Sequence, residues 1–451
     1  MCGIIGPKCN KGEMKMKKKI VAVMLCVCVM LCAPFSVMGL SADATTAAVN
    51  ETAATILTKV PSAVFGNEWE IMGLARSGVN VPDGYFDAYY ENVKQYVAST
   101  ADDKGRLHSR KSTENSRLIL ALSAIGKDSR DVAGKDLIAP LADFDYVKYQ
   151  GINGVIYALI AIDTYSYDLP DIGDAAKQTD REKCVSYILS QQKTAGGWAL
   201  FGNAADPDIT AMAIQSLSPY YNTDVNVKTA VDNALGVLSS LQQSNGGFSS
   251  WGSVNSESCA QVICALLSLG INPETDSRFV KSGGNLLDAL MGFYVTGGGF
   301  GHTNNTFNGM ATQQGFYTLV SFKRFLNSQT GLYNMSDVLK NSAANVDSLI
   351  EAIGTVNADS SDAINAARNA YNGLIEPARR YVTKLSVLEK AERDFNSGAF
   401  NTGNSNTENN DILVPPTSDK SNAVLWSMVM LFSAAALVVL KNKKEKVDEL
   451  D

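Results

Sequence analysis

The sequence predicts an all-α protein: an α6/α6 toroid, which is a double ring of six inner and six outer helices, then a small three-helix module and a C-terminal transmembrane helix. Three observations predict this organisation. Apolar segments with helical spacing recur about every 50 residues over 45–340. Gly-Gly-aromatic turns join several of these segments. An apolar run at 423–440 contains no charge.

Six short apolar segments define the expected inner helices. Each begins at a small or polar residue, ends on a leucine and is apolar around most of its circumference, which is typical of a buried helix. The terminal leucines are Leu74, Leu122, Leu159, Leu217, Leu266 and Leu319. The spacing leaves room for a second helix in each repeat.

More strongly charged segments lie between the apolar ones. Each has a single apolar stripe, as at Val231, Leu235 and Leu238, which is typical of a helix that covers a core. The expected outer helices are 45–60, 86–99, 132–143, 180–192, 227–243 and 285–295. Six outer and six inner helices in alternation predict a closed ring, because closure removes the unburied end faces of an open array.

Three of the connections into inner helices carry Gly-Gly followed by an aromatic residue. The aromatic residues are Trp198, Phe248 and Phe300. Glycine readily adopts the positive φ of a tight turn. We expect each aromatic ring to fill the gap between neighbouring repeats.

This turn follows Gln-Gln at 191–192 and 242–243 and precedes a helix of small residues. It resembles the repeats of the prenyltransferase and squalene-cyclase superfamily, and the resemblance spans residues 60–330. The resemblance implies an α6/α6 toroid with a ligand in its central cavity. That superfamily includes protein prenyltransferase β subunits, triterpene cyclases and vitamin B12 carriers of the transcobalamin type.

The catalytic groups implied by the resemblance are incomplete. Triterpene cyclases use the middle acid of D-x-D-D-T, whereas the matching stretch here reads Asp206-Pro-Asp208-Ile209-Thr210. Ile209 removes a carboxylate that could raise the pKa of a catalytic acid. The alternative interpretation is that Asp206 or Asp208 caps the following helix. Prenyltransferases hold zinc with Asp, Cys and His, but no such trio is found, since His302 has no cysteine suitably near it.

The sequence therefore favours ligand binding without catalysis. Polar side chains gather at the expected starts of the inner helices, with aromatic residues on or beside them, as in many small-molecule sites. The expected ligand-binding residues are Trp69, Asn115, Gln150, Asn153, Trp198, Asp206, Asp208, Trp251, Glu257, Gln261, His302, Gln313, Gln314 and Tyr317, with Glu70 among them. The alternative is that most of these residues cap helices or fill the barrel.

Composition excludes several classes of protein. Of the 451 residues, 45% are hydrophobic, which excludes wholesale disorder. The net charge of −7 excludes a nucleic-acid-binding protein, which needs a basic surface. The chain has two histidines, so no metal site is expected. Cys184, Cys259 and Cys264 are the cysteines after residue 32; we expect buried thiols, because an odd number gives no disulfide framework.

The two ends of the chain predict its compartment. Lysines 17–19, an apolar run at 20–32 and small residues ending in Ala42-Asp43-Ala44 predict a signal peptide at 1–44. The apolar residues 423–440 and the basic segment that follows predict a membrane-spanning helix and a cytoplasmic tail at 441–451. The intervening residues are then expected outside the cell.

The segment before the membrane is expected to lift the toroid from the surface. Residues 345–395 predict three helices, at 346–353, 362–374 and 377–395, and resemble short spacer modules of Gram-positive surface proteins. Residues 396–422 predict a disordered stalk, because they are rich in Asn, Ser, Thr and Gly. Val414-Pro-Pro-Thr417-Ser418 resembles a degenerate sortase signal, which implies attachment to peptidoglycan.

The sequence thus predicts a cell-surface protein, anchored in the plasma membrane or cell wall, that holds a small hydrophobic or corrinoid-like molecule. A corrinoid is implied by the B12 carriers, although no β-rich segment after residue 335 matches the β domain of those carriers. One alternative is a divergent terpene-cyclase-type or prenyltransferase-like enzyme with Asp208 as its acid. The other is a surface scaffold or adhesin whose ring is filled by its own aromatic side chains.

Overall fold

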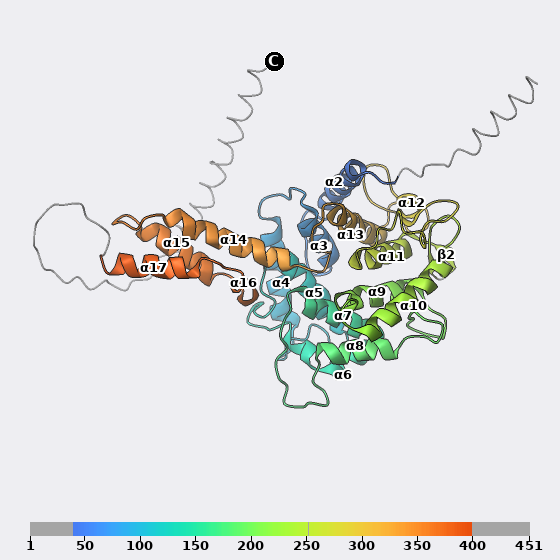
Figure 1. The fold of residues 1–451 in the computed structure, drawn as a ribbon, viewed down its shortest axis with the longest axis horizontal. Helices are drawn as coiled ribbons and strands as arrows, with labels where there is room; N and C mark the ends of the chain where they lie inside the picture. The colour runs from blue at the N-terminus through green and yellow to red at the C-terminus, as the bar shows by residue number, and fades with distance from the viewer. Residues whose placement is uncertain (1–38, 251, 399–451) are drawn as a thin grey trace, which may run out of the picture. The chain divides into compact units, whose positions relative to one another are not determined.

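A computed structural model describes residues 39–250 and 252–398, and these residues are mainly helical (Figure 1). Their strands form one short hairpin, β1 (Ser249–Ser250) and β2 (Ser253–Val254). Within the described residues, no helix is both long and apolar enough to cross a membrane. The predicted stalk from 399 on, membrane helix and cytoplasmic tail lie outside these residues, as do residues 1–38 of the predicted signal peptide.

Six buried helices correspond to the expected inner helices. They are α3 (Glu68–Ser77), α5 (Ser112–Ala124), α7 (Ile152–Thr164), α9 (Pro207–Leu217), α11 (Ser256–Ser268) and α13 (Gly309–Leu326). Each helix contacts the next one along the chain, and α13 also contacts α3 (Figure 1). Their apolar residues make up much of the main hydrophobic core, as the sequence predicts.

Five of the six expected outer helices are present. They are α2 (Ala42–Lys59), α4 (Tyr85–Thr100), α8 (Arg181–Ser190), α10 (Val225–Leu241) and α12 (Leu286–Met291). Because α2 begins at Ala42, the signal cleavage predicted after Ala44 falls within its first turn. The short 3-10 helices η2 (Lys148–Gln150) and η3 (Ser218–Tyr220) precede α7 and follow α9.

The expected outer helix at 132–143 is wrong. This segment contains a turn, the 3-10 helix η1 (Ala139–Ala142) and then the four-residue α6 (Phe144–Val147). Gly134 has a φ of +76°, inside a turn closed by the pairing of Val132 with Lys135. Pro140 follows, and it has no backbone N–H to donate to a helix that started earlier.

The Gly-Gly-aromatic turns have equivalent structures. Trp198, Phe248 and Phe300 are completely buried in the main hydrophobic core, as side chains that fill space between helices must be. Trp198 N donates to Thr210 Oγ1 over 2.9 Å, and Phe300 N donates to Thr312 Oγ1 over 3.0 Å, so that a threonine of the next helix holds each turn. These two repeats therefore share geometry as well as sequence.

The last of these turns joins the end of the repeats to their beginning. Thr55 Oγ1 in α2 donates to Gly297 O over 2.9 Å, and the Tyr294 hydroxyl donates to Glu51 Oε2 over 2.7 Å. A side chain at Gly298 would place Cβ 2.4 Å from the backbone oxygen of Glu51, so the two segments meet closely at this glycine.

The C-terminal module has its own small core. It contains α14 (Ser336–Ile353), α15 (Ser361–Asn372), α16 (Glu376–Arg379) and α17 (Leu385–Asn396). The single helix predicted at 377–395 is therefore wrong, and α16 and α17 replace it. Asp347 in α14 interrupts this segment, because its carboxylate accepts hydrogen bonds from the backbone N–H groups of Thr383 and Lys384.

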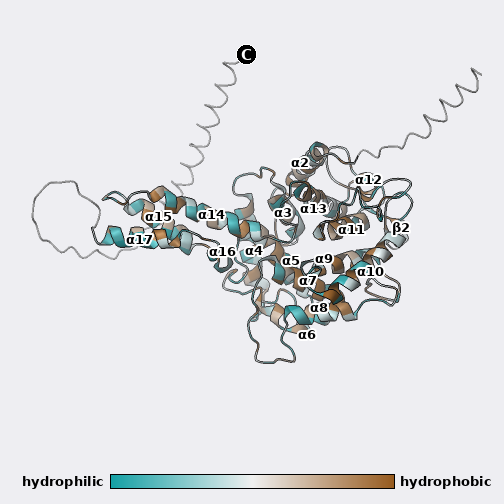
Figure 2. Ribbon diagram, in the orientation of Figure 1, coloured by the Kyte–Doolittle hydropathy of each residue, from teal (hydrophilic) through white to brown (hydrophobic). Residues whose placement is uncertain are grey.

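Helix α14 belongs to two cores. Leu339 near its start packs in the main core, whereas Val346 and Ile350 pack in the core of the module. The boundary predicted at 340–345 thus falls inside a continuous helix. Figure 2 shows hydrophobic residues concentrated in α7, α9 and α11, and hydrophilic residues prominent in α14 and α17.

The three described cysteines are free and buried, as the sequence predicts. Burial raises the pKa of Cys184, Cys259 and Cys264 to about 12. These thiols stay protonated at neutral pH and are poor nucleophiles.

Candidate functional site

Several expected site residues lie at one common level of the inner helices. Trp69, Asn153, Asp208 and Glu257 are the second residues of α3, α7, α9 and α11. Because the chain enters each inner helix through these residues, the equivalent position recurs once per repeat. The sequence thus identified a recurring structural position.

A chain of buried amides joins the three neighbouring helices α9, α11 and α13. Gln215 Nε2 donates to Gln261 Oε1 over 3.0 Å, and Gln261 Nε2 donates to Gln314 Oε1 over 2.8 Å and to the Tyr317 hydroxyl over 2.6 Å. These hydrogen bonds connect α9 to α11 and α11 to α13 through buried side chains. They also leave the amide donors of Gln261 engaged within the protein.

Glu70 and Gln313 join the first and last inner helices. Gln313 Nε2 donates to Glu70 Oε1 over 2.7 Å, while Glu70 Oε2 is buried and accepts no hydrogen bond from the described residues. Burial raises the pKa of Glu70, and the Gln313 hydrogen bond opposes that shift.

Asp206 and Asp208 have different roles. Asp206 caps α9, because its Oδ1 accepts from the backbone N–H groups of Asp208 and Ile209, each over 3.0 Å. Asp208 Oδ1 is buried, and no group among the described residues donates to it with hydrogen-bond geometry. Burial raises the pKa of Asp208 to about 6, and the charges of Asp206 and Glu257 add to the shift, whereas nearby Ser258 opposes it.

Asp208→Asn is expected to stabilise the protein at neutral pH. A folded-state pKa of about 6, against an ordinary value of 3.8, means that ionised Asp208 destabilises the fold. The penalty is fully present above pH 6 and disappears as pH falls toward 3.8. We expect a gain of about 2 kcal/mol at pH 7.5 in urea unfolding, shrinking to near zero at pH 4.

The exposed Asp83→Asn variant is the control for this measurement and should change stability by less than about 0.5 kcal/mol. An equal gain at pH 4 and pH 7.5 for Asp208→Asn would contradict the electrostatic explanation.

His302 forms a pair with Glu257 at the exposed edge of this level. His302 Nδ1 lies 2.8 Å from Glu257 Oε2, which also accepts from the Ser256 hydroxyl. Among the described residues, no group of three or more His, Cys, Asp or Glu side chains could hold a metal ion.

Three further expected site residues use their polar groups in hydrogen bonds within the protein. Asn115 is fully buried; its amide donates to Gly105 O and Leu137 O, over 2.8 and 3.2 Å. Gln150 Oε1 accepts from Thr113 N over 3.1 Å, and Trp198 Nε1 donates to a backbone oxygen of α8 over 2.7 Å. Trp251 lies outside the described residues.

Aromatic side chains fill the interior beside the amide chain. Trp69 lies 5.9 Å from Tyr157 and 5.8 Å from Tyr317, measured between ring centroids. Helix α5 packs against both α3 and α7 and lies between them. The contact of Trp69 in α3 with Tyr157 in α7 therefore joins two helices that are not neighbours. These aromatic side chains therefore fill part of the space beside the expected binding level.

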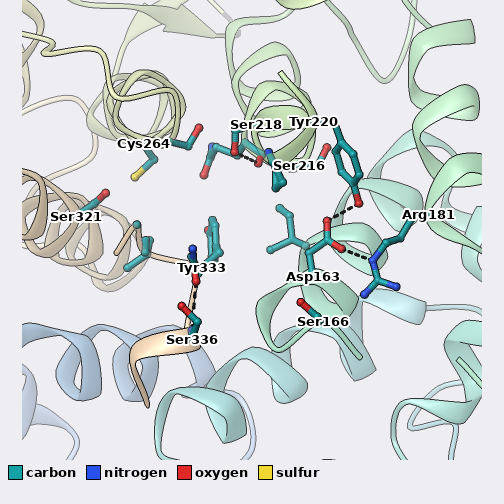
Figure 3. Close-up of a pocket in the computed structure, with 17 residues that line it drawn as sticks. Asp163, Ser166, Arg181, Ser216, Ser218, Tyr220, Cys264, Ser321, Tyr333 and Ser336 are labelled. Atoms are coloured by element: carbon teal, nitrogen blue, oxygen red, sulfur yellow. Dashed lines mark hydrogen bonds and ion pairs between the residues drawn. The ribbon is translucent and has the colours of Figure 1, made fainter. Parts of the chain in front are cut away.

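A cavity of about 560 Å³ lies at the opposite ends of the inner helices (Figure 3). Its wall comes from the last turns of α7, α9 and α11, from Ser321 of α13 and from the segment 331–336. The side chain of Tyr333 enters the cavity from that segment, which Thr164 holds by donating its hydroxyl to Tyr333 O over 2.7 Å.

A fixed polar cluster forms one side of this cavity. Asp163 Oδ1 accepts from Arg181 Nε, and Asp163 Oδ2 accepts from the Tyr220 hydroxyl, each over 2.7 Å (Figure 3). Burial raises the pKa of Asp163, and the contacts with Tyr220 and Arg181 oppose the shift. The cluster comes from α7, α8 and η3, so three segments fix its geometry.

The sequence analysis missed these residues because it considered the starts of the inner helices. Asp163, Tyr220 and Tyr333 follow or end inner helices, and the cavity faces those ends. Asp163 and Ser218 were an available signal, because they are the first polar residues after Leu159 and Leu217, the leucines that mark two successive apolar helices.

No family model matches the chain, and no curated protein matches it in sequence. The resemblance to the prenyltransferase and squalene-cyclase superfamily therefore depends on the turns and on the order of the helices. The structure supports the coarser description, an all-α protein of many packed helices.

Proposed function

We propose that this chain is a non-catalytic, cell-surface binding protein that encloses a small molecule in an α6/α6 toroid. The observation that carries the proposal is the cavity of about 560 Å³ among the ends of the inner helices. This size lies within the usual range for small-molecule sites, and a pre-formed polar cluster in an otherwise mixed wall is typical of them.

The toroid is proposed from the connectivity of the helices. The contact between α13 and α3, the Gln313–Glu70 hydrogen bond and the contacts of the last turn with α2 all favour closure. The side-chain hydrogen bonds from α9 to α11 and from α11 to α13 favour inner helices that are neighbours in the ring. The surface location rests on the apolar segments near the two ends of the sequence.

The ligand is expected to be smaller than a corrinoid. A cavity of about 560 Å³ is too small to enclose a complete corrinoid macrocycle with its side chains. The described residues around the cavity also include one cationic side chain, Arg181, and it is already paired with Asp163.

Native mass spectrometry of the full chain purified from its own cells tests this function. We expect an additional mass of a small molecule that is lost on unfolding. A Tyr333→Trp variant, which enlarges the side chain inside the cavity, should lose the added mass and keep the helical circular-dichroism spectrum. Detection of the bare chain alone, with no thermal shift on adding an extract of those cells, would contradict the proposal.

The second candidate function is acid catalysis by Asp208 in a terpene-cyclase-type reaction. The raised pKa of Asp208, about 6, favours it, because a carboxyl near this value can donate a proton close to neutral pH. Cyclisation of squalene by the purified chain, abolished by Asp208→Asn, would establish this activity. The third candidate, a scaffold, is favoured by the aromatic contacts of Trp69 with Tyr157 and Tyr317, which fill part of the interior.

A further inference from the structure

The cavity wall formed by α9 and α11 presents hydrogen-bond acceptors whose own donors are engaged. The hydroxyl groups of Ser216, Ser218 and Ser268 each donate to a backbone oxygen three residues earlier, over 2.9, 2.9 and 2.7 Å. A serine hydroxyl has one proton and two lone pairs. These three side chains therefore retain the capacity to accept hydrogen bonds and have little left to donate.

The charged cluster next to this wall engages most of its donors within the protein. The Tyr220 hydroxyl donates to Asp163, and Arg181 Nη2 donates to the backbone oxygens of Ile162 and Tyr167 over 2.9 and 3.0 Å. Figure 3 shows Asp163 between the cavity and Arg181. The guanidinium is thus paired with the carboxylate at the cavity wall, so that its positive charge is neutralised and offers little attraction to an anionic ligand.

The ends of three helices add a negative potential to the same wall. The last turns of α7, α9 and α11, together with residues that follow them directly, form one side of the cavity. Through the helix macrodipole, each C-terminus carries the equivalent of about half a negative charge. Convergence of three such ends favours a positively charged group.

The opposite side of the cavity is compatible with a cation. Tyr333 extends its ring into the cavity across from Asp163 (Figure 3). An aromatic face attracts an organic cation. The hydroxyl groups of Ser321 and Ser336 on this side accept as well as donate.

We infer that the cavity binds a small organic cation that carries a primary ammonium group. The ammonium group would donate its N–H groups to Ser216, Ser218 and the helix ends, while its carbon chain would lie along Ile160, Leu332 and the Tyr333 ring. A quaternary ammonium ion is disfavoured because it has no N–H to donate. This inference rests on the proposed binding function and specifies its ligand class.

Isothermal titration calorimetry of the full chain at pH 7 with three probes of equal chain length tests the ligand class. The probes are n-pentylamine, which is protonated at this pH, neutral 1-pentanol and anionic pentanoate. We expect pentylamine to bind at least about tenfold more tightly than pentanol, and pentanoate to bind most weakly.

Two variants connect that preference with the cavity. Ser216→Ala should weaken pentylamine binding about threefold and pentanol binding by less, since the lost acceptor pairs with a charged N–H in the amine and with a neutral O–H in the alcohol. The matched control is Ser348→Ala in α14, an exposed serine that also donates to its own helix, to Ala344 O over 2.9 Å. This control should not alter binding of any probe.

The possible results separate the ligand class from the binding function. Equal binding of amine and alcohol, or a preference for pentanoate, overturns the ligand class but leaves a binding cavity. A molecule without an amine in the native mass spectrum also overturns the class. Failure of all three probes together with a bare native mass overturns the binding function itself, whereas a retained amine supports both.

Discussion

Asp337→Asn is expected to lower the free energy of unfolding by about 3 kcal/mol. Arg76 Nη1 lies 2.7 Å from Asp337 Oδ1, and Arg324 Nη2 lies 2.6 Å from Asp337 Oδ2. The residues Arg76 and Arg324 are 4% and 6% exposed, so loss of their shared counter-ion leaves two buried positive charges beside each other. Urea unfolding at pH 7 measures the loss.

The effect of Asp337 should depend on pH in a defined direction. Burial by itself would raise the pKa of Asp337, but the charges of Arg76 and Arg324 outweigh it and hold the pKa below its ordinary 3.8. The stabilisation is therefore fully present above pH 3.8 and is lost as pH falls through the lower, folded-state pKa. The difference between the parent and Asp337→Asn should stay constant from pH 7 to pH 5 and close under stronger acid.

Asp362→Asn is a matched control for Asp337→Asn. Asp362 is also the second residue of a helix, α15, but it is exposed and no ion pair joins it to an arginine in the structure described. Its loss should cost about 0.5 kcal/mol, the usual effect of an acid near a helix N-terminus. Similar losses for both variants would contradict the role of the two arginines.

Gly298→Ala is expected to destabilise the protein by about 3 kcal/mol. The new Cβ would lie 2.4 Å from Glu51 O and 2.8 Å from Thr55 Oγ1, and the φ of +106° at this position is unfavourable for a residue with a side chain. The backbone of α2 cannot move away without breaking the hydrogen bond between Thr55 and Gly297. The midpoint of thermal unfolding gives the measurement.

Gly297→Ala separates the two causes of this effect. Gly297 has a similar φ of +88°, but nothing lies within 4 Å of a Cβ built there. This variant should therefore lose about 1 kcal/mol, the cost of the backbone conformation alone. Equal losses at 297 and 298 would show that close contact with α2 contributes nothing.

The sequence predicted most of the helices because its signals are local and repeated. Each inner helix is rich in apolar residues. Trp198, Phe248 and Phe300 each follow two glycines before an inner helix, which identifies three equivalent turns. The helix predicted at 132–143 was wrong because the apolar residues there have helical spacing, whereas Gly134 and Pro140 prevent a continuous helix. The long helix predicted from Pro377 was wrong because the backbone N–H groups of Thr383 and Lys384 donate to Asp347 instead. Asp347 is distant in the sequence, so no local pattern indicates this contact.

The candidate site was harder to predict because its residues are distant in the sequence and come together only in the folded structure. Glu257, Gln261 and Gln314 are indeed on neighbouring elements, but whether their level is open depends on the volumes of Trp69, Tyr157 and Tyr317. The cavity at the other helix ends combines residues from 160 to 336, including Tyr333 from a segment without helical periodicity. No local pattern relates these residues to one another.

The pairing of Arg76 and Arg324 with Asp337 has a mechanical consequence. Asp337 lies in the first turn of α14, so a pulling force applied at the end of the module would reach the repeats through this helix. The two arginines belong to the first and last inner helices, α3 and α13, which contact each other. The force would therefore be divided between these two helices. Under tension, α15 to α17 should therefore unfold before α3 and α13 separate. The repeats would stay folded while the module lengthens.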